Sequence, residues 1–203
     1  AVAALEAGRA DVGLGHLELG GGVVHRLARH QLAVHQLAGA GQVAAGLVLV
    51  LAEKGGKGKK PESPPAAKPV MIKQKDTYYL YCTGRGISVF SSKDLKNWKP
   101  EPAIFNEKPV WVDAVVPNFD NHIWAPDVSF HNNIYYLYYS VSAFAKNTSA
   151  IALTTNTTLD PKDPAYKWVD HGIVIQSVPN RDLWNAIDPN LTLDENNTPW
   201  LAF

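Results

Sequence analysis

A hairpin pattern recurs three times between Pro69 and Phe203. Each copy alternates apolar residues, turns on Asn, Asp or Lys, and continues into an aromatic-rich strand; the copies are MIKQKDTYYLYCTG, VSFHNNIYYLYYSV and NLTLDENNTPWLAF. They follow Pro69, Pro126 and Pro189, which are 57 and 63 residues apart. Alternation around such turns is typical of β-hairpins. The repeat therefore predicts an all-β fold built from similar units over residues 69–203.

Second hairpins lie between these copies. ISVFSSKDLKNWKP and SAIALTTNTTLDP…YKWVDHG each read as a strand, a polar turn and a Trp-containing strand. Four strands per roughly sixty residues is the pattern of β-propeller blades, and a β-sandwich with evenly spaced strands is the alternative. The stretch supplies about two and a half blades. Because propellers need about four to eight blades to close, we expect the isolated stretch to be unstable as a monomer.

The composition changes near residue 54. Residues 1–53 use only nine residue types, all of which can be encoded by codons that start with G or C. This pattern is expected when a G/C-rich gene is read in a wrong frame, so we interpret 1–53 as a non-native segment from a gene-model artefact. A natural low-complexity segment is the alternative. Residues 54–68 read as a basic Gly/Pro/Lys linker.

Bulk properties favour no charged or membrane partner. The 19 Lys and Arg balance the 19 Asp and Glu, so no overall field points to nucleic acid or an anionic membrane. The most apolar run, 43–52, is too short to span a bilayer, and no signal peptide is recognisable. Cys82 is the sole cysteine, which excludes an internal disulfide framework and a cysteine metal site.

Chemistry-bearing residues stand beside the prolines that open the repeats. In a propeller the first strand of each blade lines the central axis, so Lys68, Asp127 and Asp188 are expected to converge. Converging carboxylates fit glycoside hydrolysis or a cation site, whereas an Asp beside Pro can also simply cap a turn. These readings stay open on spacing alone.

Aromatic side chains stand near the same positions: Trp124, Phe144 and Trp184. A flat aromatic face can pack against the C–H surface of a sugar, because it buries a large area in a rigid geometry. For each of them, packing in an ordinary core is the competing interpretation.

Three longer strings resemble a known family. HIWAPDV (122–128), YYLYYSVSAFAKNTSAI (135–151) and VPNRDLWNAIDPNL (178–191) are similar to family 43 glycoside hydrolases, and most of all to endo-acting arabinanases. The resemblance covers residues 69–203. It implies a five-bladed propeller that hydrolyses α-1,5-L-arabinofuranosyl bonds in plant cell-wall arabinan with inversion. An arabinofuranosidase or β-xylosidase of the same family, or a non-catalytic carbohydrate-binding propeller, are the alternatives.

The resemblance also implies roles for particular residues. Asp188, in Ile-Asp-Pro, corresponds to the aspartate that tunes and orients the general acid, and Lys68 stands where the base aspartate is expected. Asp127 corresponds to a structural aspartate near the groove. The residues expected to bind substrate are Trp124, Phe144, Asn185, Ala186, Ile187 and Asp188.

The departure at residue 68 has a chemical cost. A lysine ammonium carries three donors and no acceptor, so Lys68 cannot take a proton from water, and the glutamate expected as general acid falls after Phe203. We therefore expect the chain as written to be inactive. The resemblance further implies secretion, a monomer when complete, and no cofactor in this chain, with calcium in the axial cavity of a complete propeller.

Overall fold

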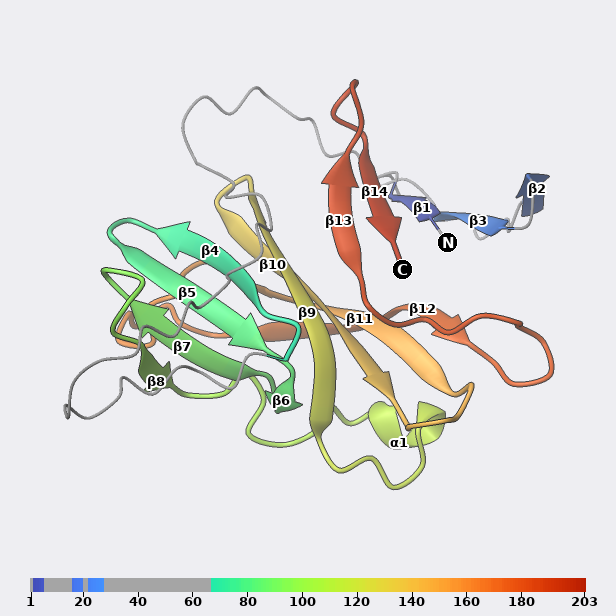
Figure 1. Cartoon of the computed structure of the whole chain (residues 1–203), viewed down its shortest axis with the longest axis horizontal. Helices are drawn as coiled ribbons and strands as arrows, with labels where there is room; N and C mark the ends of the chain where they lie inside the picture. The colour runs from blue at the N-terminus through green and yellow to red at the C-terminus, as the bar shows by residue number, and fades with distance from the viewer. Residues whose placement is uncertain (1, 6–15, 20–21, 28–66) are drawn as a thin grey trace, which may run out of the picture.

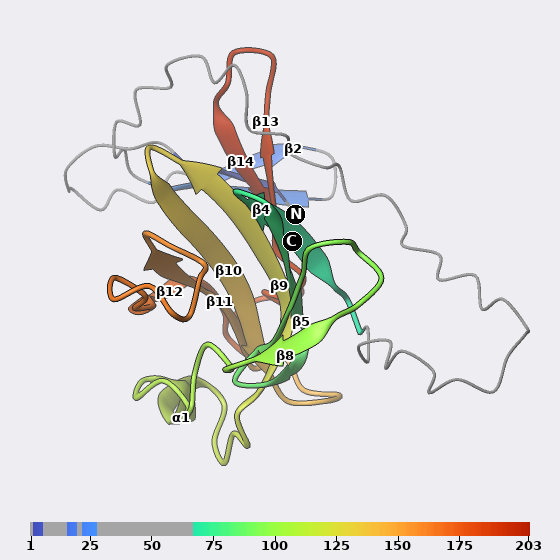
Figure 2. The same cartoon turned by 90° about the vertical axis from the view of Figure 1, so that its left-hand side faces the viewer.

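The computed structural model describes residues 2–5, 16–19, 22–27 and 67–203. Strands dominate this part of the chain and form three sheets (Figures 1 and 2). The strands are β1 (Val2–Leu5), β2 (His16–Leu19), β3 (Gly22–Leu27), β4 (Val70–Gln74), β5 (Thr77–Cys82), β6 (Gly84–Arg85), β7 (Ser88–Ser92), β8 (Lys99–Glu101), β9 (His122–His131), β10 (Ile134–Ser142), β11 (Ser149–Asn156), β12 (Val169–Ser177), β13 (Asn190–Leu193) and β14 (Pro199–Ala202). The all-β prediction is confirmed for the described residues.

The first sheet is an antiparallel meander in the order β4-β5-β7-β8. Its first hairpin turns at residues 75–76, where Lys75 takes the left-handed conformation with φ 54°. The pairing of Gln74 with Thr77 leaves a two-residue loop, for which positive φ is the favoured geometry. The hairpins predicted around the polar turns at 74–76 and 93–97 are both present.

The second sheet has the order β12-β11-β10-β9-β6, so that β9 to β12 again form a four-stranded meander. The third sheet contains the hairpin β13-β14, and β14 also pairs with β1. The interpretation of residues 1–53 as an artefact and of 54–68 as a linker falls mostly on residues outside those described.

The first strands of the three repeats lie side by side. Strand β9 contacts both β4 and β13, and in Figure 1 β4 is drawn to the left of β9 and β13 to its upper right. The described residues form open sheets, and none of these sheets closes on itself. Adjacent first strands bring the residues before β4, β9 and β13 toward one region.

Two hydrophobic clusters hold the sheets together. The larger joins the first two sheets through side chains such as Tyr81, Leu137 and Tyr139. The smaller packs Ile151 of β11 against Ala186 and Leu201, and thereby attaches the third hairpin. Full burial of a large apolar side chain contributes about 1.5–3 kcal/mol, so these clusters fix the sheet positions.

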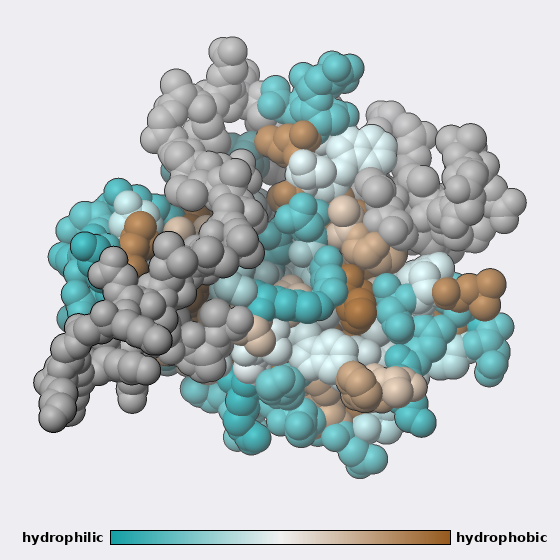
Figure 3. Space-filling view, viewed as in Figure 1, coloured by the Kyte–Doolittle hydropathy of each residue, from teal (hydrophilic) through white to brown (hydrophobic). Residues whose placement is uncertain are grey.

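The surface mixes polar and apolar residues, and Figure 3 shows brown apolar patches separated by teal polar ones on the viewed face. The one helix in the described residues, α1 (Val112–Val115), is a single short turn. In the described part of the chain, no helix has the length and apolar character needed to cross a membrane.

Candidate active site

Lys68 and Asp188 meet across 120 positions of sequence. The Lys68 Nζ donates to both carboxylate oxygens of Asp188. The two residues stand two positions before β4 and β13, whose first residues are Val70 and Asn190. Their side chains are 56% and 46% exposed, so the pair lies at the surface and contributes about 0–1 kcal/mol to stability. Of the three residues expected to converge, Lys68 and Asp188 therefore meet, whereas Asp127 binds the backbone N–H of Leu191.

An open hollow of about 210 Å³ lies beside this ion pair. Ala67, Lys68, Thr83 and Trp124 line it. Thr83 links two sides of the hollow through hydrogen bonds. Its N–H donates to the Ala67 carbonyl at 3.1 Å, and its Oγ1 accepts from the Ala125 N–H at 2.9 Å. Trp124, on β9, therefore lines the same hollow as Lys68.

The backbone of Asp188 is strained. Its φ is 57°, a left-handed conformation that is unusual for a residue other than glycine. The Asp188 N–H donates to Oγ of Ser140 at 3.0 Å, and Ser140 is fully buried on β10. This buried hydroxyl helps to hold the strained residue in place.

The residues just before Asp188 are held by Ser149 of β11. Ser149 Oγ accepts from the Ala186 N–H at 2.9 Å and donates to Oδ1 of Asn185 at 3.2 Å. Ala186 is fully buried, Ile187 is half-buried, and Asn185 is exposed. The loop therefore presents Asn185 and Asp188 to solvent, while Ala186 shapes it from the core side; substrate contact by all four residues stays a prediction.

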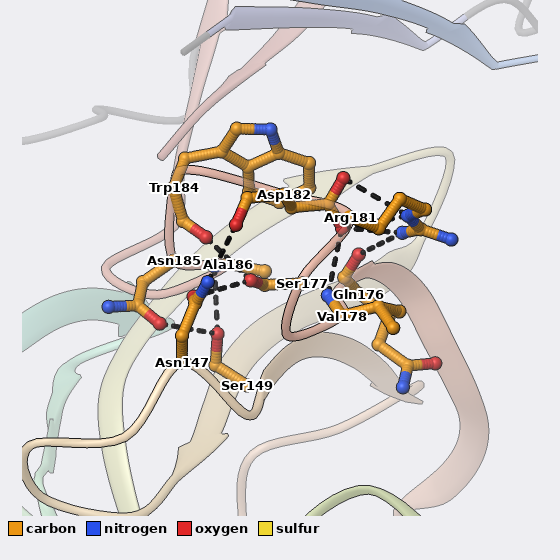
Figure 4. A network of polar contacts seen from close by, with 10 residues as sticks. All are labelled: Asn147, Ser149, Gln176, Ser177, Val178, Arg181, Asp182, Trp184, Asn185 and Ala186. Carbon is orange, nitrogen blue, oxygen red and sulfur yellow. Dashed lines mark hydrogen bonds and ion pairs between the residues drawn. The ribbon is translucent and has the colours of Figure 1, made fainter.

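Phe144 projects from the loop between β10 and β11 with 90% of its side chain exposed. Asn147, on the same loop, bonds to the neighbouring loop that follows β12 (Figure 4). Its Nδ2 donates to the Asp182 carbonyl at 2.7 Å, and its Oδ1 lies 2.7 Å from Ser177 Oγ. The exposed phenyl ring thus stands on a loop that is bonded to the Asp188 loop.

Trp184 and Asp127 take structural positions. Trp184 is half-buried against the smaller core cluster, and its ring meets Phe203 edge-on at 5.4 Å. Oδ2 of Asp127 accepts from the Leu191 N–H at 2.7 Å. Burial raises the pKa of Asp127, and the hydrogen bonds from Leu191 and Asn190 offset part of that effect. Core packing explains Trp184, and a structural role fits Asp127.

The same region offers few groups that could bind a cation. Within residues the structure describes, no three His, Cys, Asp or Glu side chains gather closely enough to hold a metal ion. The Asp188 carboxylate is engaged by Lys68, and Asp127 bonds to the backbone. Both carboxylates are therefore engaged by other groups of the chain, and a cation site in the complete propeller stays a prediction.

Sequence reasoning missed the supporting residues of the site. Five polar side chains form hydrogen bonds with backbone atoms around the site: Thr83, Ser140, Asn147, Ser149 and Ser177. Ser140 and Ser142 alternate in YYSVS, which places two hydroxyls on one face of a strand. That alternation was a usable signal for a polar contact on one face, although it does not identify the partner.

Comparisons with known proteins cover the same part of the chain. Residues 64–203 match the model of glycosyl hydrolases family 43. The chain is 54% identical over 135 residues to an extracellular exo-α-(1→5)-L-arabinofuranosidase of Cellvibrio japonicus, an alignment of 66% of this chain and 39% of that protein. It is 43% identical over 139 residues to an extracellular endo-α-(1→5)-L-arabinanase of Bacillus subtilis, covering 66% of this chain and 42% of that protein.

Solved structures give the same match. A Cellvibrio cellulosa α-L-arabinanase complexed with arabinohexaose aligns with a TM-score of 0.67 and 51% identity, over 68% of this chain and 44% of the other. A native Bacillus subtilis arabinanase aligns with a TM-score of 0.62 and 42% identity, over 68% and 47% of the two chains. The chain thus spans less than half the length of these relatives.

Proposed function

Because this chain belongs to family 43 of the glycosyl hydrolases, we propose that it forms part of a five-bladed propeller that binds α-1,5-linked L-arabinofuranose chains. The observation that carries the proposal is the meeting of residues 68 and 188 beside the hollow lined by Trp124. In the proposed site Asp188 belongs to the catalytic carboxylates, Trp124 and Phe144 are the aromatic walls, and Asn185–Asp188 form the loop at the cleavage point.

The chain as written binds arabinan without hydrolysing it. An inverting glycosidase needs one carboxylate to activate water and one carboxylic acid to protonate the leaving oxygen. Lys68 occupies the first position with a group that only donates, and its ammonium engages Asp188. A general base or acid contributes about 10²–10⁴-fold, so its loss removes useful hydrolysis.

Exo-acting cleavage is the second candidate for the native activity. The relative with 54% identity is named an exo-acting arabinofuranosidase, and the one with 43% identity an endo-acting arabinanase. An open groove across the sheets favours endo cleavage, whereas a groove closed at one end favours exo cleavage. The products that the complete protein releases from linear arabinan, once position 68 carries aspartate, distinguish the two.

The other parts of the proposal follow from the relatives. Both curated relatives are named extracellular, so we propose secretion, with plant arabinan as the polymer that is bound. The complete propeller is proposed to act as a monomer and to hold calcium in its axial cavity.

Isothermal titration of linear arabino-oligosaccharides into the chain tests the proposal. We expect saturable binding, weakened about tenfold by Trp124→Ala, which corresponds to about 1.4 kcal/mol. Reducing-sugar release from arabinan is expected to stay at the background level. Absence of binding, or equal binding of unrelated linear glucans, would reject arabinan as the ligand.

A further inference from the structure

The segment that carries Asp188 crosses one end of the second sheet and is bonded to each of its four long strands. One side chain from each strand binds the backbone of residues 184–191. The contacts are Ser177 Oγ of β12 to the Trp184 carbonyl at 2.5 Å, Ala186 N–H to Ser149 Oγ of β11 at 2.9 Å, Asp188 N–H to Ser140 Oγ of β10 at 3.0 Å, and Leu191 N–H to Asp127 Oδ2 of β9 at 2.7 Å. We call residues 184–191 the crossing segment.

The register of the sheet explains why these side chains face the same segment. Ser149 pairs with Ser142 on one side and with Ser177 on the other, and directly opposed residues point to the same face. Ser140 lies two positions from Ser142 and therefore shares that face. Ser140, Ser149 and Ser177 are all fully buried, so their hydroxyls are held in fixed positions beneath the crossing segment.

Ser140 differs from the other three because of what it binds. Its partner is the N–H of Asp188, whose backbone is left-handed (φ 57°), a conformation that only a few per cent of non-glycine residues adopt. That conformation sets the direction in which the Asp188 side chain leaves the backbone. In this structure it points to Lys68.

We propose that Ser140 is a positioning residue for Asp188: its buried hydroxyl holds the strained backbone of Asp188, so that the carboxylate faces residue 68. The inference rests on the proposed function for its catalytic meaning, because Asp188 matters to chemistry only if this is the active site. The placement itself can be measured without substrate.

Carbodiimide cross-linking followed by peptide mass spectrometry measures that placement. The reagent joins a carboxylate to a lysine amine that already touches it, so the wild-type chain should yield a Lys68–Asp188 amide. Lys108 and Asp113 form a second ion pair, at 2.8 Å, and serve as an internal reference. We expect Ser140→Ala to lower the Lys68–Asp188 product about fivefold relative to the Lys108–Asp113 product, the effect of one net hydrogen bond.

Two further variants separate positioning from folding. Ser140→Thr keeps the hydroxyl and should keep most of the Lys68–Asp188 product. Ser142→Ala removes a hydroxyl on the same face that bonds only residues 143 and 148, and should leave both products unchanged. An unchanged Lys68–Asp188 product in Ser140→Ala, an equal fall of both products, or a fall in Ser140→Thr as large as in Ser140→Ala would overturn the inference.

The two proposals fail separately. If the cross-link depends on Ser140 but the chain binds no arabino-oligosaccharide, the proposed function fails and the positioning role stands. If the chain binds the oligosaccharide and the cross-link ignores Ser140, the positioning role fails alone.

Discussion

Lys68 determines the charge of the candidate active site. It places an ammonium against Asp188, where the family resemblance predicts a second carboxylate. The two opposite charges neutralise each other, and the ammonium of Lys68 has no lone pair that could accept a proton from water. Among the residues that line this hollow there is no glutamate to act as the acid.

Lys68→Asp should therefore leave arabinan hydrolysis at background. The substitution supplies a candidate base, but the carboxylic acid that an inverting mechanism also needs is not among the residues that line the hollow. It also sets two carboxylates close together, which repel each other. Reducing-sugar assays check the activity, and Lys68→Asn, which carries neither charge, is the control. Measurable cleavage by Lys68→Asp would show that the acid is already present.

Phe144 provides a residue whose removal should affect binding alone. Its ring is 90% exposed, so Phe144→Ala removes little buried area and should leave the melting temperature unchanged. Affinity for arabino-oligosaccharides should fall about tenfold if the ring stacks on a sugar. Leu95→Ala, at another exposed apolar residue, is the matched control, and an equal loss in both variants would exclude a specific contact.

At the scale of elements, the hairpins were predictable and the loops were not. Alternation and turn residues are local signals, so sequences such as TYYLYC and IYYLYYSVS indicated β5 and β10 directly. The contacts of Ser140, Ser149 and Ser177 join positions far apart in sequence, and a buried strand serine carries no local mark of its partner. The resemblance identified Asp188 and Lys68, whereas their direct ion pair followed only from the structure.

The loop after β12 should depend on Asn147. This side chain lies 2.7 Å from both the Asp182 carbonyl and Ser177 Oγ. Arg181, the residue before Asp182, is a cleavage site for trypsin. Asn147→Ala should raise the rate of cleavage after Arg181 about fivefold, the effect of about one net hydrogen bond. Limited proteolysis followed by mass spectrometry checks this. Cleavage after Lys162, in the separate turn at residues 160–163, should be unchanged; a rise at both sites would indicate general unfolding.

At the scale of the whole molecule, the sequence predicted repeating four-stranded sheets and adjacent first strands. The β4-β5-β7-β8 and β9-to-β12 meanders and the contacts of β9 with β4 and β13 agree with this. Ring closure depends on contacts between repeats that local patterns do not specify, so the five-bladed architecture stays a prediction.

Alkaline pH should destabilise the fold. Burial raises the pKa of Tyr79 to about 12 and that of Cys82 to about 11, above the ordinary values of 10.0 and 9.0. At high pH these groups lose their protons more readily in the unfolded chain than in the folded one. Each group therefore contributes about 2–3 kcal/mol to the free energy of unfolding at a pH below its ordinary pKa. That contribution is lost as the pH rises through the raised pKa of the folded state.

Urea unfolding followed by circular dichroism should show a free energy of unfolding that falls between about pH 9 and pH 12. Tyr79→Phe removes one of the titrating groups and should flatten the decline between the ordinary and raised values of tyrosine. A free energy of unfolding that does not change over this range would contradict the assignment of both groups as buried and neutral.

The crossing segment also joins the second sheet to the third hairpin, since it runs directly into β13. Its hydrogen bonds to β9, β10, β11 and β12 hold this short segment against the second sheet. The positions of Asp188 and of the β13-β14 hairpin are therefore linked through one continuous stretch of backbone that the second sheet holds.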